Sequence, residues 1–237
     1  MYSDALTLRA RDNADGRPSP PTKAGGQRAI RGGPGRRARR VPTSSLAFQS
    51  GDVLRKALEE SAPEVGRHST EVGRLVQVTA ERLGLGRSQQ LEVRLAAELH
   101  DVGKIAIPDS ILNKPGRLTR DERAAVERHS VIGERILAVA PALADVARLV
   151  RSSHEWMDGR GYPDRLAGDD IPLGSRLVAV CDAYDAMVSD RPYQSTVGVE
   201  AALVELRLCC GSQFDADIVE PFCDVILENQ EAAQGAL

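Results

Sequence analysis

The chain contains only four histidines, and each falls on a different predicted helix or helix end: His68, His100, His129 and His154. Imidazole is the commonest metal ligand, although a single histidine on a helix is more often held by an ordinary hydrogen bond. His100 is followed at once by Asp101 and then by Gly103 and Lys104. A carboxylate and an imidazole at the end of an apolar helix are costly to bury as packing alone, so this group favours a metal ligand set.

Two further acidic residues extend the pattern. Glu64 precedes His68 by four positions, so both side chains project from one face of a predicted helix. Asp182 interrupts an otherwise apolar helix, where a buried charge requires a partner such as a cation. Helices that present carboxylate and imidazole groups at this spacing are a known way to hold metal ions. The residues therefore indicate a metal centre assembled between helices.

Helices are the elements that must position these residues. Apolar positions recur at spacings of three and four in the segments 52–61, 64–83, 88–101, 120–139, 142–154, 174–189, 198–209 and 216–230. Aromatic residues make up 3% of the chain, and no long period-two alternation predicts strands. We therefore predict an all-α fold, a single compact helical domain over residues 51–237, with one long loop near 155–173. A long loop within a compact helical domain is often functional.

The first fifty residues differ from the rest in charge and composition. Residues 1–50 hold ten Lys/Arg against three Asp/Glu, and the remainder holds 21 against 31. Many Pro and Gly residues predict a disordered basic tail. Its cluster of Arg36, Arg37, Arg39 and Arg40 is compatible with contact to RNA, DNA or an acidic lipid surface, or with a solvated tail of no fixed function. The acidic body makes specific nucleic-acid binding unexpected.

Composition also excludes several other classes of protein. No run of about 18 apolar residues is present, so we expect no membrane span. The four cysteines all lie between Cys181 and Cys223, and they are too few for a disulfide scaffold. We expect reduced thiols in a cytoplasmic protein, without a cysteine zinc site.

The motif His100-Asp101 with Gly103-Lys104, and the loop Asp158-Gly159-Arg160-Gly161-Tyr162-Pro163, together resemble the HD superfamily of metal-dependent phosphohydrolases and its HD-GYP subfamily. The resemblance covers about residues 55–227 and includes Ile107-Pro108, the segment Ile111–Thr119, Gly133, Asp185 and Ser189–Tyr193. It implies a helical bacterial enzyme of second-messenger signalling. Such an enzyme hydrolyses cyclic di-GMP to linear pGpG or GMP with two or three iron or manganese ions.

Site roles follow from this resemblance, residue by residue. It assigns metal ligation to His68, His100, Asp101, His129, His154 and Asp182, with Glu64 as the extra carboxylate of three-metal members. Asp101 would bridge two ions that clamp a phosphodiester and activate a water molecule. Lys104 would neutralise the phosphoryl oxygens and Arg191 would hold the second phosphate. The alternatives are a surface lysine at position 104 and a local salt bridge at Arg191.

Two positions depart from the family pattern. Ser153 stands where the family usually has a histidine, which weakens one metal site because an uncharged hydroxyl is a poorer ligand. Gln194 stands where a basic residue often follows Arg-Pro-Tyr. These departures keep two alternatives open: a degenerate domain that binds a nucleotide or protein without turnover, and a phosphohydrolase of another nucleotide.

The signature loop Gly161-Tyr162-Pro163 also has more than one interpretation. Gly159 and Gly161 permit positive φ, and Pro163 stiffens the end of the loop. Trp156 and Tyr162 either pin the loop onto the core or offer a face for guanine stacking or for a signalling-protein partner.

Overall fold

The computed structural model describes residues 43–189 and 197–234. Its α-helices are α1 (Thr43–Ser61), α2 (Pro63–Arg82), α3 (Arg87–Leu99), α4 (Asp109–Leu112), α5 (Arg120–Glu127), α6 (His129–Leu137), α7 (Ala144–Arg151), α8 (Leu173–Val188), α9 (Val199–Leu208) and α10 (Ala216–Gln234). Three 3₁₀ segments are η2 (Val102–Ala106), η3 (Pro141–Leu143) and η4 (Gly168–Asp170). Within these ranges the only β-type pairings are two isolated bridges. The predicted all-α fold is confirmed.

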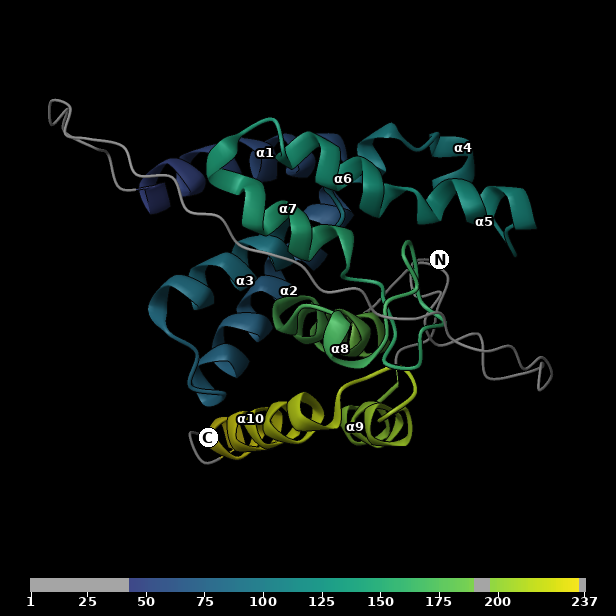
Figure 1. Ribbon diagram of the computed structural model, residues 1–237. Helices are drawn as coiled ribbons and strands as arrows, with labels where there is room; N and C mark the ends of the chain where they lie inside the picture. Colours follow the sequence, from purple (N-terminus) through teal and green to yellow (C-terminus); the bar gives the residue numbers. More distant parts are fainter. Residues whose placement is uncertain (1–42, 190–196, 235–237) are drawn as a thin grey trace, which may run out of the picture.

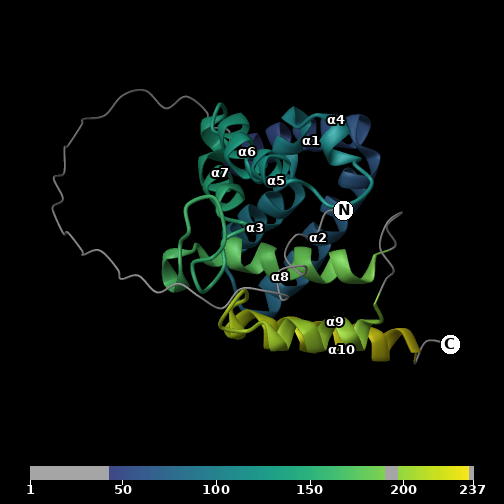
Figure 2. The ribbon, with the colours of Figure 1, turned by 90° about the vertical axis from the view of Figure 1, so that its right-hand side faces the viewer.

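The helices form layers around a central group (Figure 1). Helices α2, α3 and α8 pack against one another in the middle, and α9 and α10 pack on one side of α8. Helices α1, α6 and α7 lie on the opposite side, where α6 contacts both η2 and α7. Figure 2 shows the same order from the side. The elements that carry the four histidines therefore converge around the junction of the central and upper layers.

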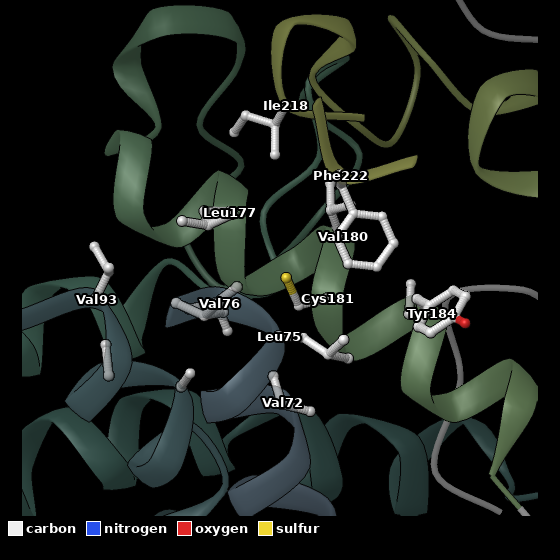
Figure 3. Packing of buried hydrophobic residues seen from close by; sticks show 14 of the residues in the cluster. Val72, Leu75, Val76, Val93, Leu177, Val180, Cys181, Tyr184, Ile218 and Phe222 are labelled. Carbon is white, nitrogen blue, oxygen red and sulfur yellow. The ribbon is translucent and has the colours of Figure 1, made fainter. Parts of the chain in front are cut away.

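Helix α8 supplies the centre of the hydrophobic core (Figure 3). Its buried side chains face α2 on one side and α10 on the other, and the labelled contacts come from Val72, Leu75, Val76, Leu177, Val180, Cys181, Tyr184, Ile218 and Phe222. The rings of Tyr184 and Phe222 meet edge to face at 5.1 Å. The core is mostly aliphatic, as the composition predicts. Because α8 is anchored over most of its surface, the acidic side chains on its remaining face are held rigidly.

Membrane spans and cysteines are the subjects of two further expectations. None of the described helices is both long enough and apolar enough to cross a lipid bilayer. All four cysteines are free thiols, as expected, and burial raises the pKa of Cys223 to about 11.

Helix α1 begins earlier than predicted. The sequence prediction assigns residues 1–50 to a disordered tail, whereas Thr43–Ser50 belongs to α1 and residues 1–42 lie outside the described part. Ala47 and Leu54 pack against the core. Between them Gly51 lets α1 approach α3 closely, since a Cβ atom at Gly51 would lie 2.5 Å from Leu95 Cδ1. Helix α1 therefore crosses the predicted boundary between tail and domain.

The predicted helix 120–139 is two helices. A capping box of Thr119 and Glu122 starts α5, with the Glu122 N–H donating to Thr119 Oγ1 at 3.3 Å. A break at Arg128 separates α5 from α6, so that His129 is the first residue of a new helix. This places the His129 ring beside the carbonyl end of α5, to which it donates a hydrogen bond.

Gly103 leaves the space that a close contact between η2 and α6 requires. Helix α3 already ends at Leu99, and Gly103 lies inside η2. A Cβ atom at Gly103 would lie 1.9 Å from the His129 carbonyl oxygen and 2.6 Å from the Gly133 nitrogen. These are backbone atoms, which cannot move aside without shifting a helix. The glycine therefore lets η2 approach α6, which brings Asp101 close to His129.

Gly103→Ala should lower the free energy of unfolding of the metal-free protein by about 3 kcal/mol, because the methyl group forces η2 away from α6. Urea unfolding monitored by circular dichroism measures the change. Gly198→Ala is the matched control, since a Cβ atom there meets nothing within 4 Å, and it should cost less than about 1 kcal/mol. Equal unfolding midpoints for the two variants would contradict the close contact.

Candidate metal centre

Five of the predicted ligands form two groups that share one residue. His68, His100 and Asp101 make the first group, and Asp101, His129 and His154 make the second. Within each group the potential ligand atoms lie within 4.8 Å of one another. Asp101 faces both groups, because its Oδ2 lies 3.5 Å from His100 Nε2 and its Oδ1 lies 3.5 Å from His129 Nε2. The arrangement could hold two cations on either side of one carboxylate.

The Asp101 carboxylate is buried and only half satisfied. Its side chain is 1% exposed, and Oδ2 accepts a hydrogen bond from Lys104 Nζ at 2.5 Å. Oδ1 is buried without a hydrogen-bond partner, which is costly unless a cation or a donor lies there. Burial raises the pKa of Asp101, but the charges of His100 and Lys104 outweigh it and hold the pKa well below the usual value. Asp101 is therefore an ionised carboxylate with one oxygen available to a cation.

Backbone contacts orient two of the histidine rings. His100 Nδ1 lies 2.8 Å from the Ala97 carbonyl oxygen, and His129 Nδ1 lies 2.8 Å from that of Val126. A ring that donates from Nδ1 to a carbonyl is left with the Nε2 lone pair for an ion. His129 Nε2 lies 2.9 Å from His154 Nε2, which is close enough for both ring nitrogens to contact one ion.

The protonation of the second group also suits ligation. Burial lowers the pKa of His129 to about 4. Burial and the neighbouring His129 lower the pKa of His154 to about 3. Both rings are therefore neutral near pH 7, the form that binds a metal ion.

Asp182 lies beside the first group. Its Oδ1 is 2.9 Å from His68 Nε2 and 3.8 Å from His100 Nε2. Burial opposes the charge of Asp182, but the hydrogen bond from His68 lowers its pKa below the usual range. Burial likewise opposes charge on His68, and the hydrogen bonds to Asp182 and Asp185 outweigh it and raise the pKa of His68 to about 9. The carboxylates of α8 thus face α2 across the first group.

Asp185 is a functional candidate to which the sequence analysis gave no role. Its Oδ2 lies 2.5 Å from His68 Nδ1, and its Oδ1 accepts a hydrogen bond from Ser189 Oγ at 2.9 Å. The side chain is 3% exposed. The signal in the sequence was its spacing, three residues after Asp182, which puts both carboxylates on one face of α8. Asp185 fixes the His68 ring so that Nε2 faces the first group.

The other predicted site residues differ in how close they lie to the two groups. Lys104 is buried against Asp101, which is unlike a surface lysine. Glu64 lies on α2, as expected, but it is exposed and belongs to neither group. It lines a cavity that His68, Asp101 and Lys104 also line. Arg191 and Gln194 lie outside the described residues.

The signature loop packs against the second group. The Tyr162 ring stacks on His154, with centroids 5.1 Å apart and planes 15° apart. The Tyr162 N–H donates to the His154 carbonyl oxygen at 3.1 Å. Gly159 has a φ of +77° as expected, but Gly161 does not have positive φ and serves to save space, since a Cβ atom there would lie 2.3 Å from Trp156 N. The close packing of the loop holds the His154 ring in place.

Ser153 is buried beside His154 and bonded to backbone. Its side chain is 1% exposed, and its Oγ donates to the Val150 carbonyl oxygen at 2.9 Å. The hydroxyl thus caps a carbonyl group in the last turn of α7. The imidazole and carboxylate groups available to the second group are therefore those of Asp101, His129 and His154.

Asp185→Asn should weaken Mn²⁺ binding by about ten- to a hundredfold, because a neutral amide holds the His68 ring less firmly than a carboxylate does. Equilibrium dialysis of the metal-free protein against Mn²⁺ measures this directly. Asp170→Asn, at an exposed position of η4, is the control and should bind as the natural protein does. An unchanged affinity in Asp185→Asn would show that the contact with His68 has no role in metal binding.

Comparisons with known proteins agree with this geometry. The family model for the HD domain matches residues 52–218. A cyclic di-GMP phosphodiesterase of Thermotoga maritima is 40% identical over 74% of this chain and 48% of its own length. The response regulator RpfG of Xanthomonas campestris, also named a cyclic di-GMP phosphodiesterase, is 40% identical over 70% of this chain and 45% of its own. A 3′3′-cGAMP-specific phosphodiesterase of Vibrio cholerae is 39% identical over 70% and 32%.

The chain spans about half the length, or less, of these curated relatives. Solved structures agree on the fold. A Bdellovibrio bacteriovorus protein described as an HDG"Y"P protein superposes with a TM-score of 0.60 at 18% identity, over 78% of this chain and 65% of its own. The matched residues 52–218 hold all four histidines and the shared aspartate. The chain belongs to the HD domain family.

Proposed function

We propose that this chain is a metal-dependent phosphodiesterase of bacterial second-messenger signalling, which hydrolyses cyclic di-GMP to linear pGpG or GMP. The observation that carries the proposal is the shared carboxylate of Asp101, which stands between two histidine groups with one oxygen unpartnered. Two adjacent cations can stabilise both the attacking and the leaving oxygen when a phosphodiester is cleaved.

Two cations, iron or manganese, fit the donors of the two groups. Imidazoles and carboxylates are ligands that iron and manganese accept, and no thiolate is among the two groups. When bound, the ions would stabilise charge on the phosphodiester and lower the pKa of a water molecule. His68, His100 and Asp182 would hold one ion, His129 and His154 the other, and Asp101 both. A third ion at Glu64 stays a prediction, because Glu64 stands exposed at the cavity wall.

The chain's own residues contribute position and charge. Lys104 lies in the cavity wall within hydrogen-bond distance of Asp101, where its ammonium group would stabilise charge on the phosphoryl oxygens. Asp185 holds His68 in orientation, and Tyr162 covers one face of His154. The role of Arg191 as a second phosphate contact stays a prediction.

The names of the relatives support the substrate class. The relatives compared above include two cyclic di-GMP phosphodiesterases and a 3′3′-cGAMP-specific phosphodiesterase. A cyclic dinucleotide is common to both names, and cyclic di-GMP is our preferred substrate. A signalling-protein partner at Gly161-Tyr162-Pro163 also stays a prediction, and the Tyr162 ring is already packed on His154.

Ser153 supports one second candidate, a domain that binds a cyclic dinucleotide with little or no turnover. With its hydroxyl bonded to Val150, Ser153 adds no imidazole to the second group. The second ion would then have fewer protein ligands and a lower affinity.

Asp101→Ala should abolish hydrolysis of cyclic di-GMP, with a loss of at least about a hundredfold, because both ions lose their shared ligand. Chromatography of the products after incubation with Mn²⁺ or Fe²⁺ measures turnover, and elemental analysis measures bound metal. Asp145→Ala changes an exposed carboxylate on α7 and should leave both readouts unchanged. Full activity in folded Asp101→Ala protein would rule out the two-ion proposal.

Ser153→His distinguishes the enzyme from the binding module. If the second site is only weakened, an added imidazole should raise metal content and turnover together. Metal stoichiometry and cyclic di-GMP hydrolysis are compared with the natural protein, and thermal unfolding checks that the buried position accepts the larger ring. A folded variant with unchanged metal content and turnover would show that position 153 does not face the second ion.

A further inference from the structure

A cavity of about 820 Å³ opens beside the first histidine group. Its wall includes His68 and Asp101 together with the start of α2, the 3₁₀ segment η2, and α4. Pockets of this size take ligands much larger than a single phosphate group. A phosphodiester held at Asp101 would leave most of this volume for the rest of its molecule.

Among the described residues, one cationic side chain in the cavity wall has no ion-pair partner. Lys104 is paired with Asp101, and Lys114 is paired with Glu122 at 2.6 Å. Arg67 also lines the cavity, and within the described ranges it makes no ion pair or side-chain hydrogen bond. It directly precedes His68 on α2. A guanidinium group binds phosphate with two parallel hydrogen bonds, and a free one loses no existing contact when it does so.

The wall also has an exposed apolar residue. Ile105 is 58% exposed, although the preceding Lys104 and the nearby Ile107 are buried at 7% each. Among the exposed large hydrophobic side chains of the described surface, it is the one that lines the cavity. A purine base has two apolar faces that gain from such cover.

We propose that this cavity binds the second nucleotide unit of a cyclic dinucleotide, with Arg67 on the phosphate that is not cleaved and Ile105 against a base. The inference rests on the proposed function, since it takes the scissile phosphate to lie at Asp101. It adds the two residues that bind the remainder of the substrate. Their role is affinity for a substrate with two phosphates and two bases, rather than the chemical step.

Arg67→Gln and Ile105→Ala test the proposal with two substrates. For cyclic di-GMP in the presence of Mn²⁺, Arg67→Gln should raise KM about tenfold and Ile105→Ala about fivefold, each with kcat within about twofold. Bis(p-nitrophenyl) phosphate has one phosphate and no nucleobase, so Arg67→Gln should leave its kcat/KM unchanged. The KM increase in Arg67→Gln should also shrink as salt rises, because the lost contact is electrostatic.

Arg87→Gln and Val139→Ala are matched controls, since both residues are exposed and neither lines the cavity. Both should behave as the natural protein. Unchanged KM values for cyclic di-GMP in Arg67→Gln and Ile105→Ala would overturn the inference and leave the proposed function standing. Equal losses on both substrates in Arg67→Gln would also overturn it, by placing the effect at His68. A natural protein that hydrolyses neither substrate would instead refute the proposed function.

Discussion

The structure depends on the buried carboxylate of Asp101. Lysine holds one of its oxygens and the other has no donor, so its burial costs free energy. The groups around Asp101 are arranged to offset that cost. His100 and Lys104 hold it ionised. The rings that face it are oriented by contacts elsewhere, through Ala97 and Val126 carbonyls for His100 and His129. The unsatisfied oxygen then points at a position which two imidazoles also face. The unbalanced negative charge at that position favours the binding of a cation.

The fold supplies this arrangement through two kinds of close contact. Gly103 lets η2 meet the backbone of α6, which sets the separation of Asp101 and His129. Helix α8 is anchored in the core by apolar side chains on most of its surface, and its remaining face presents Asp182 and Asp185 to His68. A small shift of either element would change several ligand distances together, since packed elements move as units. Stability of the core and geometry of the centre are thus set by the same contacts.

The sequence predicted the helices well because a 3.6-residue apolar period shows directly which face is buried. It identified four histidines and two aspartates because a family resemblance assigned them. The sequence predicted neither the break at Arg128 nor the early start of α1. The early start depends on a tertiary contact, the close approach of Gly51 to Leu95. The spacing of Asp185 from Asp182 was visible in the sequence, but the contact of Asp185 with His68 was not. No sequence pattern pointed to Arg67 or Ile105, because their role depends on a cavity formed by residues distant in sequence.

The signature loop has a consequence for observing this protein in solution. Glu155 accepts hydrogen bonds from the backbone N–H groups of Asp164 and Leu166, so the two ends of the loop are tied together next to His154. Trp156 lies within this tied segment and is the single tryptophan of the chain, with the Arg160 guanidinium 5.7 Å from its ring centroid. All tryptophan emission of the protein therefore originates two residues from a candidate metal ligand. The molecule carries its own optical reporter at the edge of the second histidine group, with no label needed.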